Sequence, residues 1–308
     1  MNIRNSFAVT ILGNASAVPT ANRNLTSQLV QYGTNRFLVD CGEGTQLQMI
    51  KFRVKQTNLN HIFISHLHGD HFYGLFGLIS TFHLFGRTKP LAIFAPQALK
   101  DLLDHVLQVS NTTLRFELNF HNLEDFGDKP VYENDHFKIT CFPVVHRIPT
   151  WGFKFEEKHG IRKINKAFLA EYAPDIATIK AIKAGDGYKA PNGKVYSHNE
   201  ITEAPLNPRS YVYCADTAYD TSLAPYLFGA DLVYHEATFD DSMEALAIEK
   251  FHATARHAAL QARQAQVKKL LLGHFSARHT SLEGLLEEAR SVFENTLISE
   301  EGIRYPVE

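Results

Sequence analysis

The feature that most constrains this chain is one short run, Ser65-His66-Leu67-His68-Gly69-Asp70-His71. It follows the apolar stretch 61–65, which is typical of a β-strand. It precedes residues 73–85, where apolar residues recur at helical spacing. The connection between a strand and a helix thus carries four metal-ligating side chains within six residues. The chain has 16 histidines among 308 residues, a high share that is consistent with a metal site.

The spacing within this run predicts ligands for two metal ions. In an extended loop, His66 and His68 are two residues apart and direct their rings to the same side. Gly69 lets the backbone turn, so Asp70 and His71 begin the next element and face a different point. Imidazole nitrogen combined with carboxylate oxygen suits Zn²⁺ first, with Mn²⁺ and Fe²⁺ as alternatives.

Three later residues are candidates to complete both sites. His146, Asp216 and His274 each follow an apolar strand-like stretch by at most two residues. A carboxylate has two oxygens and can bridge two metals, so Asp216 is the expected bridge. We expect one ion to be bound by His66, His68, His146 and Asp216, and the other by Asp70, His71, Asp216 and His274.

The remaining pattern predicts an α/β chain with two similar halves, because strands are followed by helices in both. The expected strands are 7–12, 29–32, 36–40, 61–65, 91–95, 210–214, 231–235 and 269–273. The expected helices are 44–54, 73–85, 97–109, 252–266 and 283–293. Between the halves, residues 152–200 carry nine Lys/Arg and six Asp/Glu in a chain of net charge −2. We interpret residues 152–200 as a basic arm inserted into a single domain spanning 1–308.

Composition excludes several classes of protein. With 44% hydrophobic and 21% charged residues, the chain is an ordinary globular one, and its near-neutral charge excludes a uniformly basic nucleic-acid coat. No apolar run approaches the roughly 18 residues of a membrane span. Cys41, Cys141 and Cys214 are too few and too far apart for a disulfide framework. We therefore expect no membrane association and a cytoplasmic location.

The pattern His-x-His-x-Asp-His, with a later His, Asp and His, resembles the metallo-β-lactamase superfamily. Five further segments resemble the ribonuclease Z family within it. These segments are Leu12–Asn24, Val39–Gln46, His235-Glu236-Ala237-Thr238-Phe239, His252-Ala253-Thr254-Ala255 and Gly273–Arg278. The resemblance implies a four-layer αβ/βα sandwich with an inserted arm, two Zn²⁺ per chain and a homodimer. It also implies cleavage of pre-tRNA just after the discriminator base, leaving a 3′-hydroxyl on the tRNA.

The resemblance also assigns roles to individual residues. Asp70 would bind metal and orient or deprotonate the attacking water. His252, held by Glu236, would be the acid for the departing 3′-oxygen, and Asp40 would brace a metal-ligating histidine. The candidate substrate-binding residues are Arg23, Asn24, Lys180 and Lys183, with the arm as the candidate tRNA exosite.

The chain departs from the family pattern at three places. Ala21 stands where the N-terminal loop usually carries a lysine, Ala253 replaces the serine of a usual His-Ser-Thr, and the arm lacks a Gly-Pro core. Two alternatives stay open. One is a dinuclear-zinc phosphodiesterase acting on small or non-tRNA substrates. The other is a non-catalytic RNA-binding scaffold, although such proteins typically lose ligands and all seven are present here.

Overall fold

The computed structural model describes residues 6–214 and 216–308. The chain forms two compact units. The larger unit takes in the chain up to Tyr132, Ile139–Phe155 and the chain from Arg209 onward. The smaller unit takes in Glu133–Lys138 and Glu156–Pro208. Within the described residues, no helix is both long and apolar enough to cross a bilayer.

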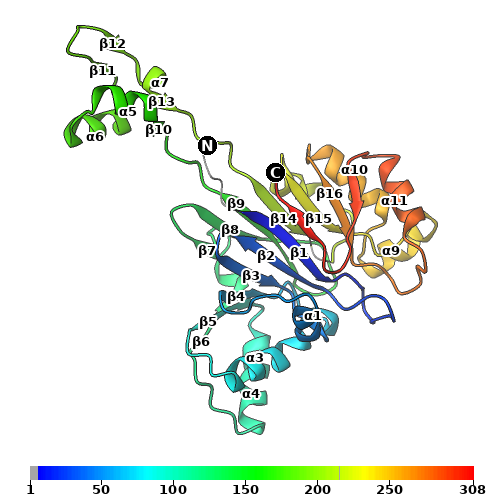
Figure 1. Ribbon diagram of the computed structural model, residues 1–308. Coiled ribbons are helices and arrows are strands. Elements are labelled where there is room, and N and C mark those ends of the chain that lie inside the picture. Colours follow the sequence, from blue (N-terminus) through cyan, green and yellow to red (C-terminus); the bar gives the residue numbers. More distant parts are fainter. Residues whose placement is uncertain (1–5, 215) are drawn as a thin grey trace. The chain divides into compact units, whose positions relative to one another are not determined.

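Two seven-stranded sheets form the centre of the larger unit (Figure 1). The first has the order β18-β1-β2-β3-β4-β5-β6, with β1 Phe7–Gly13, β2 Ser27–Tyr32, β3 Asn35–Val39, β4 Leu59–Phe63, β5 Leu91–Ala95, β6 Leu118–Asn122 and β18 Arg304–Pro306. The second has the order β17-β16-β15-β14-β9-β8-β7, with β7 Tyr132–Glu133, β8 Phe137–Pro143, β9 Trp151–Glu157, β14 Ser210–Cys214, β15 Leu232–Glu236, β16 Leu270–Gly273 and β17 Thr296–Ile298. Strands β3 to β6 and β14 to β17 run parallel to their neighbours within each series.

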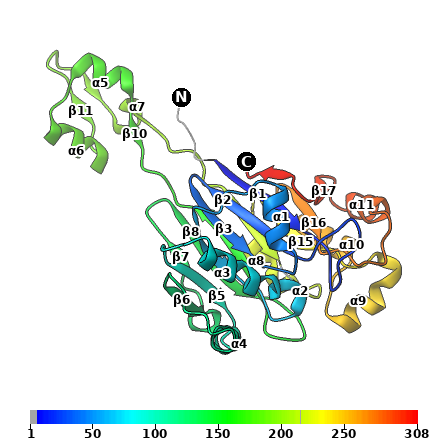
Figure 2. The ribbon, with the colours of Figure 1, turned by 60° about the horizontal axis from the view of Figure 1, so that its bottom comes forward.

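Helices cover the outer face of each sheet (Figure 2). The first sheet packs against α1 Thr45–Lys51, α3 Gly74–Leu84 and α4 Ala98–Val109. The second packs against α8 Ala224–Leu227, α10 Ala255–Gln264 and α11 Glu283–Arg290. The short helices α2 Gly69–Phe72 and α9 Glu244–Lys250 lie in connections. Helix, sheet, sheet and helix are the four layers that the resemblance implied.

Alternation along the strands explains how each sheet contacts both layers. In and just after β4, Ile62 and Ile64 belong to the core under the helices, whereas Phe63 between them points to the other sheet. The Phe63 and Phe153 ring centroids lie 5.4 Å apart at 60°. This edge-to-face pair buries a large apolar area between the sheets, so it helps to hold the two sheets together.

The predicted strands start within two residues of their observed positions, and all the predicted helices but one start within one residue. Strands β5 and β14 have the predicted bounds. The helix predicted over 252–266 begins only at Ala255, because Thr254 caps it and its hydroxyl accepts from the His257 amide at 3.2 Å. His252 therefore lies in the connection before α10 and not on the helix.

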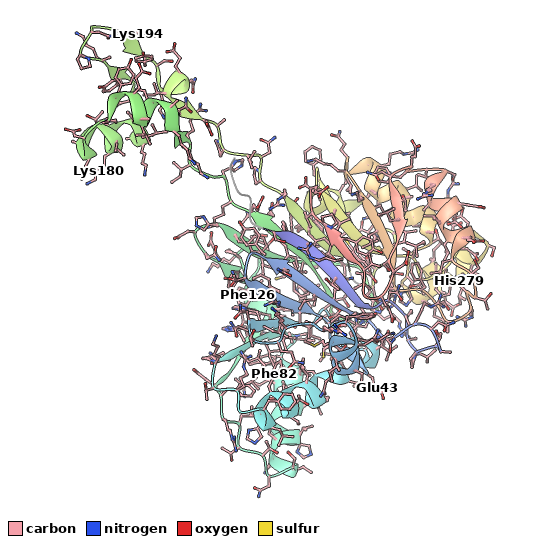
Figure 3. All side chains as sticks on the ribbon, in the orientation of Figure 1. Glu43, Phe82, Phe126, Lys180, Lys194 and His279 are labelled. Atoms are coloured by element: carbon pink, nitrogen blue, oxygen red, sulfur yellow. The ribbon has the colours of Figure 1, made fainter. Side chains whose placement is uncertain are left out.

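The smaller unit has its own secondary structure and a small core. Its elements are β10 Lys163–Ile164, α5 Lys166–Tyr172, α6 Ile176–Ala184, β11 Tyr188–Lys189, β12 Val195–Tyr196, α7 His198–Ile201 and β13 Thr202–Glu203. Phe168, Ile182 and Ile201 are buried at its centre. The boundaries differ from the predicted arm at 152–200: Gly152–Phe155 lie in β9 of the large sheet, and the unit continues to Pro208. Lys180 and Lys194 are exposed on this unit (Figure 3).

Candidate metal centre and catalytic site

The candidate ligands gather where the parallel strands end. The carboxyl ends of parallel neighbours meet at one edge of a sheet. In the first sheet, β4 leads into the loop of His66 and His68, and α2 carries Asp70 and His71. In the second sheet, Asp216 follows β14 and His274 follows β16.

One group of side chains contains His66, His68, His146 and Asp216. His66 Nε2 lies 3.1 Å from His68 Nδ1. His68 Nδ1 lies 3.2 Å from His146 Nε2. Asp216 Oδ2 completes the group at 3.6 Å from His66 Nε2 and 3.9 Å from His146 Nε2.

A second group contains Asp70, His71 and His274. The two histidines face each other with their Nε2 atoms 3.3 Å apart. Asp70 Oδ2 lies 3.5 Å from each of them. The other oxygen of Asp216, Oδ1, lies 3.1 Å from His274 Nε2 and 3.3 Å from His71 Nε2. Asp216 thus turns one oxygen toward each group, which is the arrangement a bridging carboxylate needs.

This donor set fits divalent metal ions. In tetrahedral coordination with metal–nitrogen bonds of about 2.0–2.1 Å, neighbouring ligand nitrogens lie about 3.3 Å apart, close to the 3.1–3.3 Å between the facing histidine nitrogens. Asp216 Oδ1 is buried and, among the residues that the structure describes, accepts no hydrogen bond of normal geometry, although the His71 and His274 Nε2 atoms lie close to it. A buried carboxylate oxygen is stable only when it is paired or coordinates a cation. The predicted ligands thus gather in an arrangement that fits a divalent metal site.

Burial and charge set the protonation of the two groups. Burial lowers the pKa of His66, His68 and His146. These imidazoles are therefore neutral and present the free lone pair that a metal ligand needs. His71 differs: burial opposes its charge, but Asp216, Asp70 and Asp40 outweigh it and raise its pKa. Because these carboxylates lie around the second group, that group is the more negative environment for a cation.

Asp40 holds His71 from behind. Its Oδ2 lies 2.8 Å from His71 Nδ1 and also accepts hydrogen bonds from the Ser65 and Tyr213 hydroxyls. Its Oδ1 accepts from the Ser65 amide at 2.7 Å. With Nδ1 engaged, His71 directs Nε2 to the site. The contact is the one expected for a bracing carboxylate.

Gly42 is required by a close backbone approach beside Asp40. A Cβ at Gly42 would lie 2.4 Å from the Asp70 carbonyl oxygen, far inside any normal contact. Without the side chain, the turn after β3 packs directly on α2. This contact sets the position of Asp70 and explains why the segment 39–46 carries glycine here.

The buried Glu236 and the partly exposed His252 form a pair beside the candidate metal ligands. The Nδ1 of His252 lies 2.9 Å from Glu236 Oε1, which leaves Nε2 free. Burial opposes protonation of His252, but Glu236 outweighs it and raises the pKa of His252 to about 9. The preceding residue, Phe251, has a φ of 58° and its carbonyl accepts from His146 Nδ1 at 2.9 Å. One short segment thus orients both a candidate metal ligand and the candidate acid.

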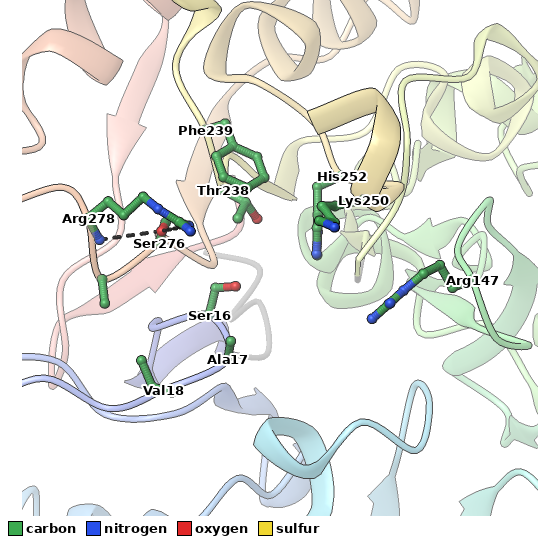
Figure 4. Close-up of a pocket in the computed structure, with 11 residues that line it drawn as sticks. Ser16, Ala17, Val18, Arg147, Thr238, Phe239, Lys250, His252, Ser276 and Arg278 are labelled. Atoms are coloured by element: carbon green, nitrogen blue, oxygen red, sulfur yellow. Dashed lines mark hydrogen bonds between the residues drawn. The ribbon is translucent and has the colours of Figure 1, made fainter. Parts of the chain in front are cut away.

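A cleft of about 560 Å³ opens beside His252 (Figure 4). Its lining includes the exposed cations Arg147, Lys250 and Arg278, and no carboxylate among the residues that the structure describes. A second hollow of about 450 Å³ shares His252 and Arg147 with it and reaches His68, Asp70 and Asp216. His252 therefore borders both the metal-ligand side and the cationic cleft, which suits an anionic chain laid across it.

The predicted substrate-binding residues are not part of this cleft. The Arg23 guanidinium donates to the Ser276 and His279 carbonyls at 3.1 and 2.8 Å, and Asn24 donates to Glu301. Both side chains therefore position loops next to the site. Lys180 and Lys183 lie on α6 of the smaller unit. A contact of these four residues with substrate stays a prediction.

Sequence reasoning missed several polar groups that support the site. Thr238 and Ser65 occur within the quoted motifs, but hydroxyl partners follow only from the packed structure. Tyr213 alternates along a buried strand like an ordinary core residue, yet it donates to Asp40. The Phe251 carbonyl has no sequence signal other than its place beside His252.

Comparisons with known proteins agree with this geometry. A ribonuclease Z of Bacteroides fragilis is 43% identical over 297 residues, which cover 96% of this chain and 98% of that protein. A ribonuclease Z of Phocaeicola vulgatus is 42% identical over 302 residues, 98% of each chain. The crystal structure of human tRNase Z, short form, superposes with a TM-score of 0.71 at 26% identity and covers 98% of this chain and 99% of that one.

A family model matches the first half of the chain. Residues 7–162 belong to the family described as "Anti-Pycsar protein Apyc1". That match includes the His66–His71 run and His146 but ends before Asp216, Glu236, His252 and His274. The ribonuclease Z relatives instead align over nearly the whole chain, both halves of the site included. The chain belongs to the ribonuclease Z family of the metallo-β-lactamase fold.

Proposed function

We propose that this protein is an endoribonuclease that removes the 3′ trailer of pre-tRNA after the discriminator base and leaves a tRNA 3′-hydroxyl, with two Zn²⁺ per chain. One observation carries the proposal: a chain that aligns end to end with ribonucleases Z brings all seven candidate ligands into two adjoining groups beside the Glu236–His252 pair. Divalent ions, when bound at such a site, lower the pKa of water and offset charge on a phosphodiester.

The residues of the chain supply the remaining chemistry. Asp70 accepts from the Ala17 amide at 2.7 Å through the same Oδ2 that faces His71 and His274, so it is held where it can orient an attacking water. His252, kept protonated by Glu236, offers Nε2–H to the departing 3′-oxygen. The cations of the cleft hold the phosphates on either side of the cut.

The test is cleavage of a 3′-extended pre-tRNA by the purified protein, with the new 3′ end mapped and the metal content measured. We expect a cut after the discriminator base, about two zinc ions per chain, as two filled sites require, loss of activity with EDTA and recovery with Zn²⁺. Intact pre-tRNA together with zinc-dependent hydrolysis of a small phosphodiester would refute the tRNA assignment.

The alternative of a phosphodiesterase for small or non-tRNA substrates stays open, because the ligand groups and the hollow beside them are formed by the larger unit alone. Removal of the smaller unit distinguishes the two candidate functions. A Cβ on Gly160 would lie 3.1 Å from Pro205, so a short linker can replace residues 161–204. If this variant keeps small-phosphodiester hydrolysis and loses pre-tRNA cleavage, the smaller unit is a tRNA-binding exosite. Equal pre-tRNA cleavage by both proteins would exclude that role.

We also propose that the protein is a homodimer joined through α1 and the end of α3. Leu47 and Ile50 on α1, and Leu84 and Phe85 at the end of α3, are 62–82% exposed. Gln46 donates to Thr81 at 2.6 Å and ties the two helices into one face. Apolar side chains this exposed on neighbouring helices are typical of a protein interface.

Substitution of two matched isoleucines tests this face. Ile50 is 62% exposed on α1, and Ile248 is 63% exposed on α9. By sedimentation, Ile50→Asp should be monomeric, whereas Ile248→Asp should remain dimeric like the unmodified protein. A monomeric unmodified protein, or a dimeric Ile50→Asp variant, would contradict the proposal.

We further propose a cytoplasmic location, which fits three buried free thiols at Cys41, Cys141 and Cys214.

A further inference from the structure

The Thr238 hydroxyl lies between a candidate metal ligand and the candidate acid pair. Thr238 follows β15 and is 3% exposed. Its Oγ1 lies 2.6 Å from Glu236 Oε2 and 3.0 Å from His274 Nδ1. Figure 4 shows Thr238 and His252 at the same cleft. No role of Thr238 in the proposed reaction follows from the ligand sets alone.

The direction of these hydrogen bonds follows from counting protons. A hydroxyl donates one hydrogen bond. Two acceptors compete for it, Glu236 Oε2 at 2.6 Å and the His274 carbonyl at 3.0 Å. The shorter, charge-assisted bond to the carboxylate is the stronger one. The lone pairs of the hydroxyl are then free to accept the proton of His274 Nδ1.

This direction determines the tautomer of His274. With its proton on Nδ1, His274 presents an unprotonated Nε2, the atom 3.1 Å from Asp216 Oδ1 and 3.3 Å from His71 Nε2. The same hydroxyl completes the shell around Glu236. Oε1 accepts from His252 Nδ1 and the Thr217 amide, and Oε2 accepts from Thr238 and the Ala253 amide. Glu236 thus has four donors and a single orientation.

We propose that Thr238 is a positioning residue that couples the metal-ligating tautomer of His274 to the orientation of the Glu236–His252 pair. The proposal rests on the proposed function for its substrate, but not for its geometry. One hydroxyl holds a ligand nitrogen toward the metal side and, through Glu236, holds His252 Nε2 toward the leaving oxygen. Loss of the hydroxyl leaves His274 Nδ1–H without an acceptor and Glu236 without one of its four donors.

Paired substitutions distinguish this role from packing. Thr238→Val keeps the shape and removes the hydroxyl, whereas Thr238→Ser keeps the hydroxyl and removes a methyl group. Changes in groups that orient metal ligands typically cost about 10–100-fold in metal affinity or activity. For Thr238→Val we expect a kcat on pre-tRNA lower by about that factor, an unchanged KM, and weaker binding of one zinc ion in a titration of the metal-free protein. Thr238→Ser should restore both. A packing role predicts the reverse, with Val tolerated and Ser impaired, and would overturn the proposal.

A second comparison tests the path through His252. In a His252→Ala background, Thr238→Val should cost little further kcat, because residues that act together are not additive. The leaving group of bis(p-nitrophenyl) phosphate needs no proton, so Thr238→Val should reduce kcat less on this substrate than on pre-tRNA. Full additivity or equal losses on both substrates would refute the coupling. Failure of the unmodified protein to cut pre-tRNA would refute the proposed function instead, while the zinc titration would still decide the role of Thr238. If the Thr238→Val protein does not fold, Thr238→Ala removes the same hydroxyl and replaces it in these measurements.

Discussion

His61 should make the protein lose stability in mild acid. It lies on β4, the strand that leads to the His-rich loop, and packs against Tyr132 with ring centroids 4.7 Å apart. Burial, with the nearby charges of His121 and Arg87, lowers the pKa of His61 to about 4 from 6.5. The folded protein therefore holds this imidazole neutral.

The sign and size of the effect follow from linkage. Below pH 6.5 the unfolded chain binds a proton at His61 that the folded chain does not bind until about pH 4, so the free energy of unfolding falls through that interval and then levels off. For these two pKa values, the free energy of unfolding falls by about 2 kcal/mol between pH 8 and pH 5. His61→Phe keeps an aromatic ring next to Tyr132 and removes the group that titrates.

The measurement is urea unfolding at pH 8 and pH 5, followed by the fluorescence of Trp151, the one tryptophan of the chain. Acid weakens the metal-ligating histidines equally in both proteins, so the difference between them isolates His61. The unmodified protein should lose about 2 kcal/mol more than His61→Phe across this interval. The same loss in both proteins would refute the reasoning.

Three other substitutions test the site. Asp70→Ala should reduce kcat by orders of magnitude and leave pre-tRNA affinity nearly unchanged, since the proposed phosphate contacts are the cations of the cleft and not Asp70. A filter-binding assay separates the two effects. His252→Ala should slow cleavage about 10²–10⁴-fold, the usual contribution of a positioned acid. Loss of zinc from this variant, or an unchanged rate, would show that the assigned role is wrong. Gly42→Ala should destabilise the protein by about 1–3 kcal/mol, the cost of overpacking, because its methyl group would meet the Asp70 carbonyl. A melting temperature equal to that of the unmodified protein would contradict the account of this turn.

Strand ends were predictable, and with them most of the site. Alternation and apolar runs place Asp216 and His274 directly after strands, and parallel strands bring such ends together. What could not be predicted depends on contacts distant in sequence. The Tyr213 position has the pattern of a core residue, and only the structure shows its hydroxyl donating to Asp40. The hydrogen bonds from Arg23 to the 276–279 loop likewise have no signal in the sequence. The start of the arm was misplaced for a related reason: the charged residues of 152–157 alternate with buried phenylalanines, and β9 follows the phenylalanines.

The first and last strands of the large unit lie side by side, because β18 pairs with β1 at Val9 and Tyr305. The metal ligands are likewise divided between the two halves of the chain. During synthesis, a ribosome-bound fragment carries the His-rich loop long before it carries Asp216 or His274. Such a fragment lacks Asp216, which faces both groups, and His274, which faces His71 in the second group. An unfinished or prematurely terminated copy that stops before these residues therefore lacks a complete set of candidate ligands, and the proposed cleavage of RNA has to wait until His274 has been added.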